Sequence, residues 1–239
     1  ADPLDRLNKP SYDLKSLSRQ QGFLHELQSA LAKCGLDVLQ IDHEDAHGQY
    51  ELNFGFDEAV TSADHLMLFK LAAQAMAEAQ GMVFSMMPKP FGNQPGSGMH
   101  FHVSLWSGWN PKRPDNAQNV FVPHRGDGSV DYERSLSPTG RHFIAGVLAH
   151  AGALTALAAP TVNSYKRLRV GPSLSGTSWA PAYVAQGPNN RTAALRTLHG
   201  RFEWRVPDAS ANPYLATAAL IAAGLDGVDR KLEPPPDCI

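Results

Sequence analysis

Residues Lys89–Trp106 read KPFGNQPGSGMHFHVSLW, and the rest of the chain is interpreted around this stretch. Its first half, Gly92–Gly98, holds three glycines and a proline in seven positions. That composition favours turns with exposed backbone amides, which bind anions. From Gly98 onward apolar and polar residues alternate, as they do on a strand. The pattern therefore places His100 and His102 on one polar face.

Two histidines in a His-x-His pair are a weak metal signal, because such residues on a strand are often solvent-facing or hydrogen-bonded. Three predicted strands, however, combine one apolar face with a polar face of similar chemistry. Their polar faces are Gln49-Glu51-Asn53, His100-His102-Ser104 and Arg201-Glu203-Arg205. An ordinary antiparallel sheet with one solvated face explains the alternation. The residue types favour instead a site where Mg²⁺ or Mn²⁺ meets an anionic ligand, which is typical of phosphoryl transfer.

The composition is that of a globular protein with an ordinary core. The chain has 239 residues, of which 43% are hydrophobic, and a net charge of −2. This charge gives no reason to expect nucleic acid or an anionic membrane as a partner. The two cysteines lie far apart, and no secretory signal opens the chain, so we expect a cytoplasmic protein. The apolar run Phe143–Pro160 contains His150 and is interpreted as a core helix.

Charged residues are sorted along the chain. Between Cys34 and Phe69 there are eight acidic residues and no lysine or arginine. Between Val162 and Val206 there are seven basic residues and one acidic residue, Glu203. The first region is suited to cations and the second to anions, although two solvated faces would give the same sorting.

The hydrophobic periodicity predicts an α+β fold in which an antiparallel sheet packs on helices. The predicted helices are Leu17–Lys33, a helix capped by Thr61 or Ser62 and ending at Gln80, a helix from Ser137 to about Ala159, and Asn212 to about Gly224. The predicted strands are Leu36–Glu44, Gln49–Phe56, Met82–Met87, Gly98–Leu105, Ala182–Gln186, Thr192–Thr197 and Arg201–Val206. Residues 107–136 and 161–177 are predicted to be irregular.

Five ordered segments resemble the signatures of one known family. They are His43–Glu51, Met87–Phe91 with Gly96–His102, Asn163–Leu168, Asn190–Arg196, and Arg201–Arg205 with Pro207-Asp208 and Ala211–Tyr214. In this order they resemble the catalytic domain of glutamine synthetase. The loop after Arg167 is similar to that of the branch containing γ-glutamylmethylamide synthetase-like and type III-labelled rhizobial enzymes.

The resemblance implies a half-barrel sheet in a single domain over residues 1–239, and an ATP-dependent ligase. Such an enzyme joins ammonia or a small amine to the γ-carboxylate of glutamate through a γ-glutamyl phosphate. The implied ligands of Mg²⁺ or Mn²⁺ are Glu44 and Glu51 for one ion, and His100 and Glu203 for the second. The implied nucleotide-binding residues are Arg191, Arg196, His102, Ser104 and Phe56. The implied glutamate-binding residues are Gly96, Arg167 and Arg205, and Arg167, Arg191 and Arg196 are the implied catalytic residues. Double-ring homo-oligomers are implied as well.

Three departures from the family pattern qualify this expectation. No Glu-x-Glu motif occurs, so the chain is interpreted as a fragment, inactive alone, that lacks the amino-terminal small domain, the first metal-ligand strand and the carboxyl-terminal end. Trp179 stands before Ala180-Pro181, where the family has a glutamate that closes the ammonium site, and the preceding loop Ser173–Ser178 is longer. Pro95 replaces the asparagine that often precedes Gly96. A pocket with an indole in place of a carboxylate favours an alkylamine over ammonium.

Two other function classes stay open. A catalytically silent glutamine synthetase-like assembly module would explain the missing carboxylates. A His-x-His hydrolase would bind Zn²⁺ and give the arginines no role. His43 and His47 are either turn histidines or part of the site, and His150 is interpreted as a hydrogen-bonded core histidine.

Overall fold

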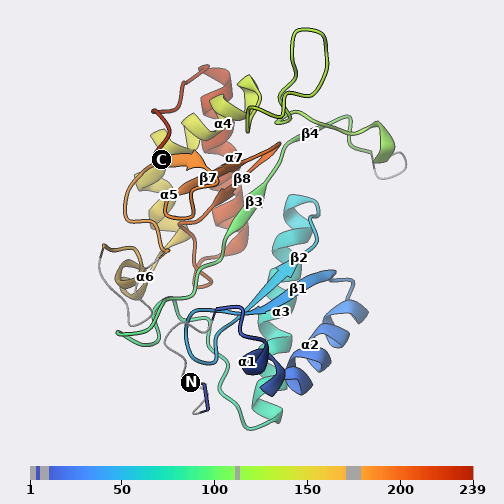
Figure 1. Cartoon of the computed structure of the whole chain (residues 1–239), viewed down its shortest axis with the longest axis vertical. Coiled ribbons are helices and arrows are strands. Elements are labelled where there is room, and N and C mark those ends of the chain that lie inside the picture. The colour runs from blue at the N-terminus through green and yellow to red at the C-terminus, as the bar shows by residue number, and fades with distance from the viewer. Residues whose placement is uncertain (1–3, 6–10, 111–113, 171–178, 239) are drawn as a thin grey trace. The chain divides into compact units, whose positions relative to one another are not determined.

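The computed structural model describes residues 4–5, 11–110, 114–170 and 179–238 (Figure 1). The chain divides into two compact units. Unit 1 comprises residues 1–97 and 171–178, and unit 2 comprises residues 98–170 and 179–239. Among the described helices, none combines the length and apolar character needed to cross a membrane.

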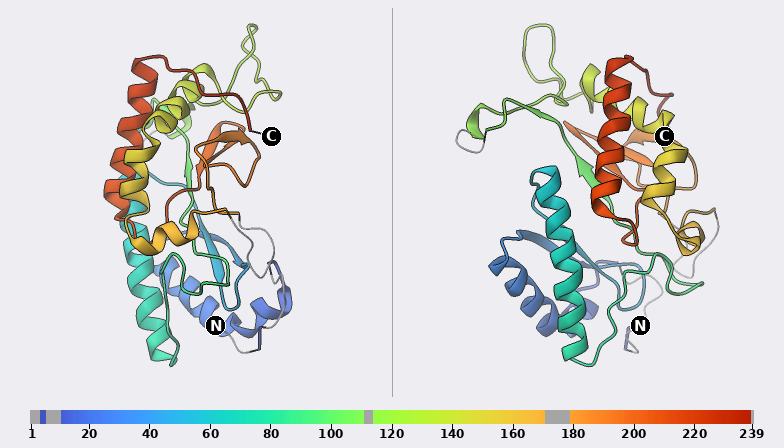
Figure 2. Two further views of the ribbon diagram at one scale, coloured as in Figure 1. Left: turned by 90° about the vertical axis from the view of Figure 1, so that its left-hand side faces the viewer. Right: turned by 180° about the vertical axis from the view of Figure 1, so that it is seen from behind.

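Unit 1 is a β-hairpin packed on helices. Its elements are α1 (Leu14–Arg19), α2 (Gln21–Lys33), β1 (Val38–His43), β2 (Tyr50–Phe54) and α3 (Ala59–Ala79). Strands β1 and β2 pair antiparallel, with Asp42 opposite Glu51. Leu27, Leu31 and Phe69 form the centre of a core between the helices and the hairpin. Figure 2 shows the ribbon of these helices and strands from two further sides. The predicted hairpin and the helix end before Gly35, whose φ is +85°, are confirmed.

Three predictions for unit 1 are wrong. The helix predicted over Leu17–Lys33 is divided at Gln20 into α1 and α2. Helix α3 begins earlier than expected, because the Glu58 carboxylate accepts hydrogen bonds from the backbone N–H groups of Val60 and Thr61 and caps the helix. Residues 82–87 form no strand in the part of the chain that the structure describes, and Val83 is 95% exposed. Phe84 and Met86 nevertheless pack on the unit 1 core, which explains the alternating pattern without a pairing partner.

Unit 2 is a mixed sheet covered by helices. Its elements are β3 (Phe101–Val103), β4 (Trp106–Ser107), a 3-10 turn (Pro114–Asn116), β5 (Gln118–Asn119), α4 (Pro138–Ala149), α5 (Ala151–Ala158), α6 (Val162–Arg167), β6 (Gln186–Pro188), β7 (Leu195–Leu198), β8 (Arg201–Trp204) and α7 (Pro213–Asp229). The main sheet has the order β3-β8-β7-β6. Phe121, Phe143 and Phe202 meet in its core. Helices α4 and α7 pack closely, because a Cβ atom on Gly146 would lie 2.1 Å from the Ala223 carbonyl oxygen.

The α+β class is confirmed, with differences in detail. The sheet is antiparallel except for β6 and β7, which pair parallel. The long helix predicted after Ser137 is broken at His150 into α4 and α5. His150 is hydrogen-bonded to Asp226 at 2.8 Å but is not a core residue, since its side chain is 43% exposed. Helix α6 forms where irregular chain was expected, because Thr161 and Ser164 cap each other reciprocally.

Candidate functional site

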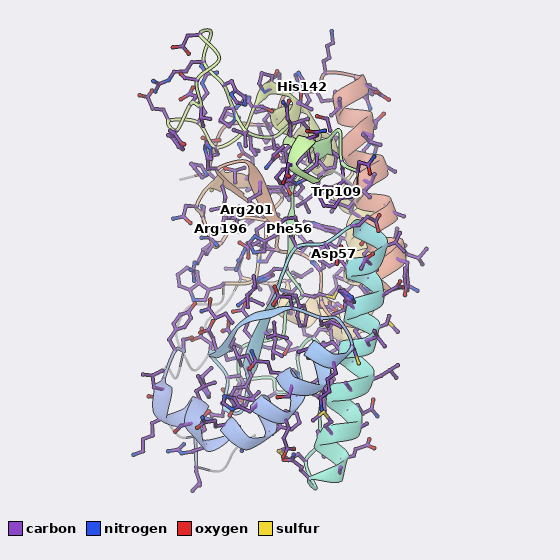
Figure 3. All side chains as sticks on the ribbon, turned by 90° about the vertical axis from the view of Figure 1, so that its right-hand side faces the viewer. Phe56, Asp57, Trp109, His142, Arg196 and Arg201 are labelled. Atoms are coloured by element: carbon purple, nitrogen blue, oxygen red, sulfur yellow. The ribbon has the colours of Figure 1, made fainter. Side chains whose placement is uncertain are left out.

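Glu203 lies at the centre of a charged cluster in unit 2. Strand β8 places it opposite Arg196 of β7 on one side and His102 of β3 on the other. Directly opposed residues on neighbouring strands share a face, so the register brings an imidazole, a carboxylate and a guanidinium into one row. Arg196 and Arg201 are labelled in Figure 3, on the neighbouring strands β7 and β8.

Glu203 is buried, and its shortest contact is to an arginine. Arg205 Nη1 donates to Glu203 Oε1 at 2.6 Å, and Arg196 Nη1 donates to Glu203 Oε2 at 3.1 Å. His100 Nδ1 lies 3.1 Å from Glu203 Oε1, and His102 Nε2 lies 4.0 Å from the same oxygen. Glu203 is 3% exposed and Arg205 is 5% exposed. We call these five residues the Glu203 cluster.

The cluster sets the protonation of its members. Burial by itself raises the pKa of Glu203, but the hydrogen bond and charge of His100, with the charges of Arg205 and His102, bring that pKa well below its usual range. Burial lowers the pKa of His102 to about 4 and also lowers the pKa of His100. The lowered pKa values favour the neutral form of both imidazoles. With Nδ1 donating to Glu203, His100 presents its Nε2 lone pair, which is the form that binds metals.

Arg196 and Arg191 supply further positive charge. Arg196 Nε donates to Asn189 Oδ1 at 2.9 Å, and Nη2 donates to the same oxygen. Burial is the main cause that lowers the pKa of Arg205, and the charges of Arg196 and Arg191 add to the shift. The charges of Arg196 and Arg191 therefore act on Arg205, and the three guanidinium groups together make this region positively charged.

Arg167 is a buried guanidinium tied to the backbone. It is 4% exposed, and its Nη2 donates to the carbonyl oxygens of Val206 and Pro207, the latter at 2.9 Å. Burial lowers its pKa to about 10. A Cβ atom on Gly98 would lie 3.3 Å from Arg167 Nη1 and 2.8 Å from His100 Nε2, so a larger residue there would displace the His100 ring. Among the described residues, the Nε atoms of Arg167 and Arg205 and the Oδ2 atom of Asp208 have no hydrogen-bond partner.

A second cluster, in unit 1, consists of Glu44 directly after β1 and Glu51 on β2. The two carboxyl groups share a hydrogen bond, and burial together with Glu51 raises the pKa of Glu44 to about 7. Two carboxylates held this close repel each other unless a proton or a cation lies between them. We call this the Glu44–Glu51 pair. Its donors are the oxygen ligands that Mg²⁺ and Mn²⁺ prefer.

Gln49 links this pair to the glycine-rich loop, a role that the sequence pattern alone did not reveal. Its Nε2 donates to Gly96 O at 3.1 Å and to Ser97 Oγ at 3.3 Å, while its Oε1 accepts from the Ala46 N–H. Gly96 is thus connected to the turn that carries Glu44. A polar residue beside a metal-ligand candidate on the same strand face was the available signal.

His43 has a structural role. It is 1% exposed, and its Nε2 lies 2.7 Å from Asp5 Oδ2, which also accepts the Gly48 N–H at 2.9 Å. Its ring packs edge-on against Tyr50. The pair Asp5–His43 therefore fixes the turn from residue 44 to residue 48, and nothing in the sequence pattern pointed to Asp5.

Several predicted site residues lie outside these two clusters. Phe56 is 82% exposed in unit 1, and Ser104 Oγ accepts a hydrogen bond from Trp106 Nε1 at 2.9 Å. Trp179 is 49% exposed, and its carbonyl oxygen accepts from Arg205 Nη2 at 3.3 Å. The predicted long loop Ser173–Ser178 lies outside the described residues.

The chemistry of both clusters fits divalent cations in part. In the described portion of the chain, no three His, Cys, Asp or Glu side chains gather in a way that would hold a metal ion. Mg²⁺ usually takes only one or two carboxylates from a protein and completes its shell with water and phosphate oxygens. Glu44 and Glu51 supply two carboxyl groups, which is within the number that Mg²⁺ usually takes from a protein. Burial and their closeness raise the pKa of Glu44.

Comparison with known proteins decides the family. Residues 3–239 match the family "Glutamine synthetase, catalytic domain". The chain belongs to the glutamine synthetase catalytic-domain family. It is 51% identical over 234 residues to the glutamate–methylamine ligase of Methyloversatilis universalis, which covers 98% of this chain and 50% of that protein. It is 40% identical to the glutamine synthetase of Rhizobium meliloti, over 98% of this chain and 51% of that protein.

The fold agrees with this family. A solved structure described as a GmaS/ADP complex matches with a TM-score of 0.87 and 39% identity, covering 100% of this chain and 52% of that one. The resemblance to glutamine synthetase, and to its methylamide-forming branch, is confirmed. This member of the glutamine synthetase family spans about half the length of the relatives it matches.

Proposed function

We propose that the protein containing this chain is an ATP-dependent ligase that joins a small amine to the γ-carboxylate of glutamate through a γ-glutamyl phosphate. The observation that carries the proposal is the Glu203 cluster, in a chain of the glutamine synthetase family. One buried carboxylate there is matched by two guanidinium groups, so the cluster keeps a net positive charge with both imidazoles neutral. Buried positive charge of this kind binds phosphate and stabilises the charge that develops during phosphoryl transfer.

Each charged group has a part in this proposal. Arg191 and Arg196 are assigned to the nucleotide phosphates, and His102, Ser104 and Phe56 are assigned to other parts of the nucleotide. Gly96, Arg167 and Arg205 bind glutamate; Arg167 acts mainly as a support, because its Nη2 is already occupied by backbone carbonyls. The attacking carboxylate of glutamate and the γ-phosphate of ATP are both anions and repel each other, and the positive charge of the arginines offsets that repulsion while the guanidinium groups orient both.

The Glu44–Glu51 pair would hold one Mg²⁺ or Mn²⁺, and His100 with Glu203 would hold a second. When bound, these ions supply Lewis-acid charge to phosphate oxygens. The residues present suit this role: Glu44 and Glu51 bring two carboxyl groups together, and the lowered pKa of His100 favours the neutral ring with a lone pair on Nε2.

We propose a small alkylamine, such as methylamine, as the acceptor in preference to ammonium. Two observations support it. The Methyloversatilis relative at 51% identity is named a glutamate–methylamine ligase. Trp179 also stands where the glutamine synthetase pattern has a glutamate, and an indole gives apolar and cation–π contact without the full charge that favours ammonium.

The test is ADP release by the full-length protein with glutamate, ATP, Mg²⁺ and either ammonium, methylamine or ethanolamine. We expect methylamine to give the highest kcat/KM, and Trp179→Glu to shift the preference toward ammonium. A strong ammonium preference in the wild type would contradict the acceptor. A silent assembly module, the competing function, would release no ADP with any amine and would bind Mn²⁺ independently of Glu51.

Assembly into a double-ring homo-oligomer and a cytoplasmic location also stay predictions. Light scattering of the full-length protein after gel filtration tests the first: a monomeric mass would contradict it. Localisation by cell fractionation tests the second.

A further inference from the structure

We propose that Asn189 is a positioning residue that orients the guanidinium of Arg196 for an anionic ligand. The inference deepens the proposed function and rests on its assignment of Arg196 to a phosphate group. Asn189 lies in the segment that leads from β6 to β7, and its side-chain oxygen accepts both Nε–H and one Nη2–H of Arg196. The opposite side of the guanidinium, at Nη1, donates to Glu203.

The two contacts together fix the plane of the guanidinium. An arginine has five N–H donors in a rigid fork. Asn189 and Glu203 engage three of them, one on each nitrogen. The remaining two, one on each terminal nitrogen, are accepted by no residue that the structure describes. A planar fork with two fixed points cannot rotate about its own axis, so these two N–H groups keep one direction.

The backbone at Asn189 is suited to this task. Its φ is +51°, in the left-handed region that asparagine adopts far more readily than most residues with a side chain. Its own N–H donates to Thr197 O at 2.9 Å, one residue beyond Arg196 on β7. The segment is also held from the other side, where the Cys238 N–H donates to Gln186 O at 2.8 Å and Asn190 Nδ2 donates to Cys238 O at 2.9 Å. These hydrogen bonds therefore fix the backbone position from which the Asn189 side chain extends.

The lack of charge on the Asn189 side-chain amide is also part of the inference. Glu203 is the one carboxylate that Arg196 and Arg205 share, so the pair of arginines keeps one unit of positive charge. An aspartate at position 189 would hold Arg196 in the same way but would cancel that charge. A glycine would keep the left-handed backbone and remove the acceptor. These two substitutions separate orientation from charge.

The experiment uses the full-length protein, labelled with ¹⁵N, and the NMR signal of the Arg196 Nε–H, assigned with Arg196→Lys. We expect Asn189→Gly to abolish the protection of this proton from solvent exchange, and Asn189→Asp to keep it. The matched control is Lys231→Gly, which removes another exposed side chain from a left-handed residue, φ +49°, away from the cluster. Unchanged protection in Asn189→Gly would overturn the inference.

Titration with ADP and Mg²⁺ measures the consequence for ligand binding. We expect Asn189→Gly to weaken ADP binding about 10-fold or more, since small misplacements of a positioned group have effects of that size or larger. In an Arg196→Gln background the same change should have no further effect. An equal loss in that background would overturn the positioning role while leaving the proposed function intact. If Arg196→Gln itself left ADP binding unchanged, the proposed function would fail, and the inference with it.

Discussion

The Glu44–Glu51 pair and the Glu203 cluster place carboxyl groups in opposite electrostatic surroundings. In unit 1 two carboxyl groups share a hydrogen bond, and the pKa of Glu44 rises to about 7. In unit 2 one carboxylate is surrounded by His100, Arg196 and Arg205, and its pKa falls. The comparison shows that the first site must obtain its counter-charge from a proton or a bound cation. The second carries its counter-charge in the chain, with charge left over for an anion.

The largest effect is expected from a substitution that removes the carboxylate of the Glu203 cluster. Glu203→Ala removes the only anion from the Glu203 cluster and leaves Arg205 buried without a counter-charge. We expect a loss of about 3–5 kcal/mol in the free energy of unfolding, the size seen when one partner of a buried ion pair is removed. Urea denaturation of this chain measures it. Glu133→Ala, which removes an exposed partner of Arg125, is the control and should cost less than about 1 kcal/mol; equal losses in both variants would refute the buried-pair interpretation.

The next largest effect is expected on Mn²⁺ binding by the Glu44–Glu51 pair. Glu44→Gln and Glu51→Gln should each weaken Mn²⁺ binding by at least about tenfold, because an amide offers the metal no negative charge. Titration followed by electron paramagnetic resonance measures free Mn²⁺. Glu78→Gln makes the same change on the exposed side of α3 and should leave the affinity unaltered. If Glu78→Gln were as harmful as Glu44→Gln, the pair would have no special role.

The pH dependence of stability sharpens the same contrast. The pKa of Glu44 is 4.5 ordinarily and about 7 in the folded chain, so its contribution to stability is present below about pH 4.5 and is lost as the pH rises to about 7. In metal-free buffer, the stability of Glu44→Gln relative to the wild type should therefore increase between about pH 5 and pH 8. Urea unfolding across that range measures the difference. A difference independent of pH would show that the carboxyl pair does not hold a shared proton.

The smallest effect is expected from a substitution in unit 1 that lowers stability without changing Mn²⁺ affinity. Glu58→Ala removes the side-chain cap of α3 and should cost about 1 kcal/mol, a typical value for a lost N-cap. Thermal unfolding detects this change. Mn²⁺ affinity should stay at the wild-type value, the reverse of the Glu44→Gln pattern; a parallel loss of Mn²⁺ affinity would mean that the pair depends on the position of α3.

Local signals in the sequence were sufficient for much of the fold. The glycine after α2, the Ser137-Pro138 start of α4 and the alternation in β2, β3 and β8 each reflect chemistry within a few residues, and the structure agrees with them. The strand predicted over residues 82–87 was wrong because this signal is local. Alternation indicates which side chains are buried, but it does not indicate whether a neighbouring strand exists. The Glu58 cap was missed because serine and threonine are the commoner capping residues.

The sequence by itself determined the family, the polar faces of the strands and the residue types of both clusters, since these follow from ordered motifs and from the two-residue period of a strand. Only the tertiary structure decided which charges meet. Strand register pairs Arg196 with Glu203, and a left-handed turn brings Asn189 to Arg196. Burial then raises the pKa of Glu44, while the hydrogen bond with His100 and the nearby charges lower that of Glu203. Such shifts depend on distance and solvent exclusion, which the order of residues along the chain does not specify.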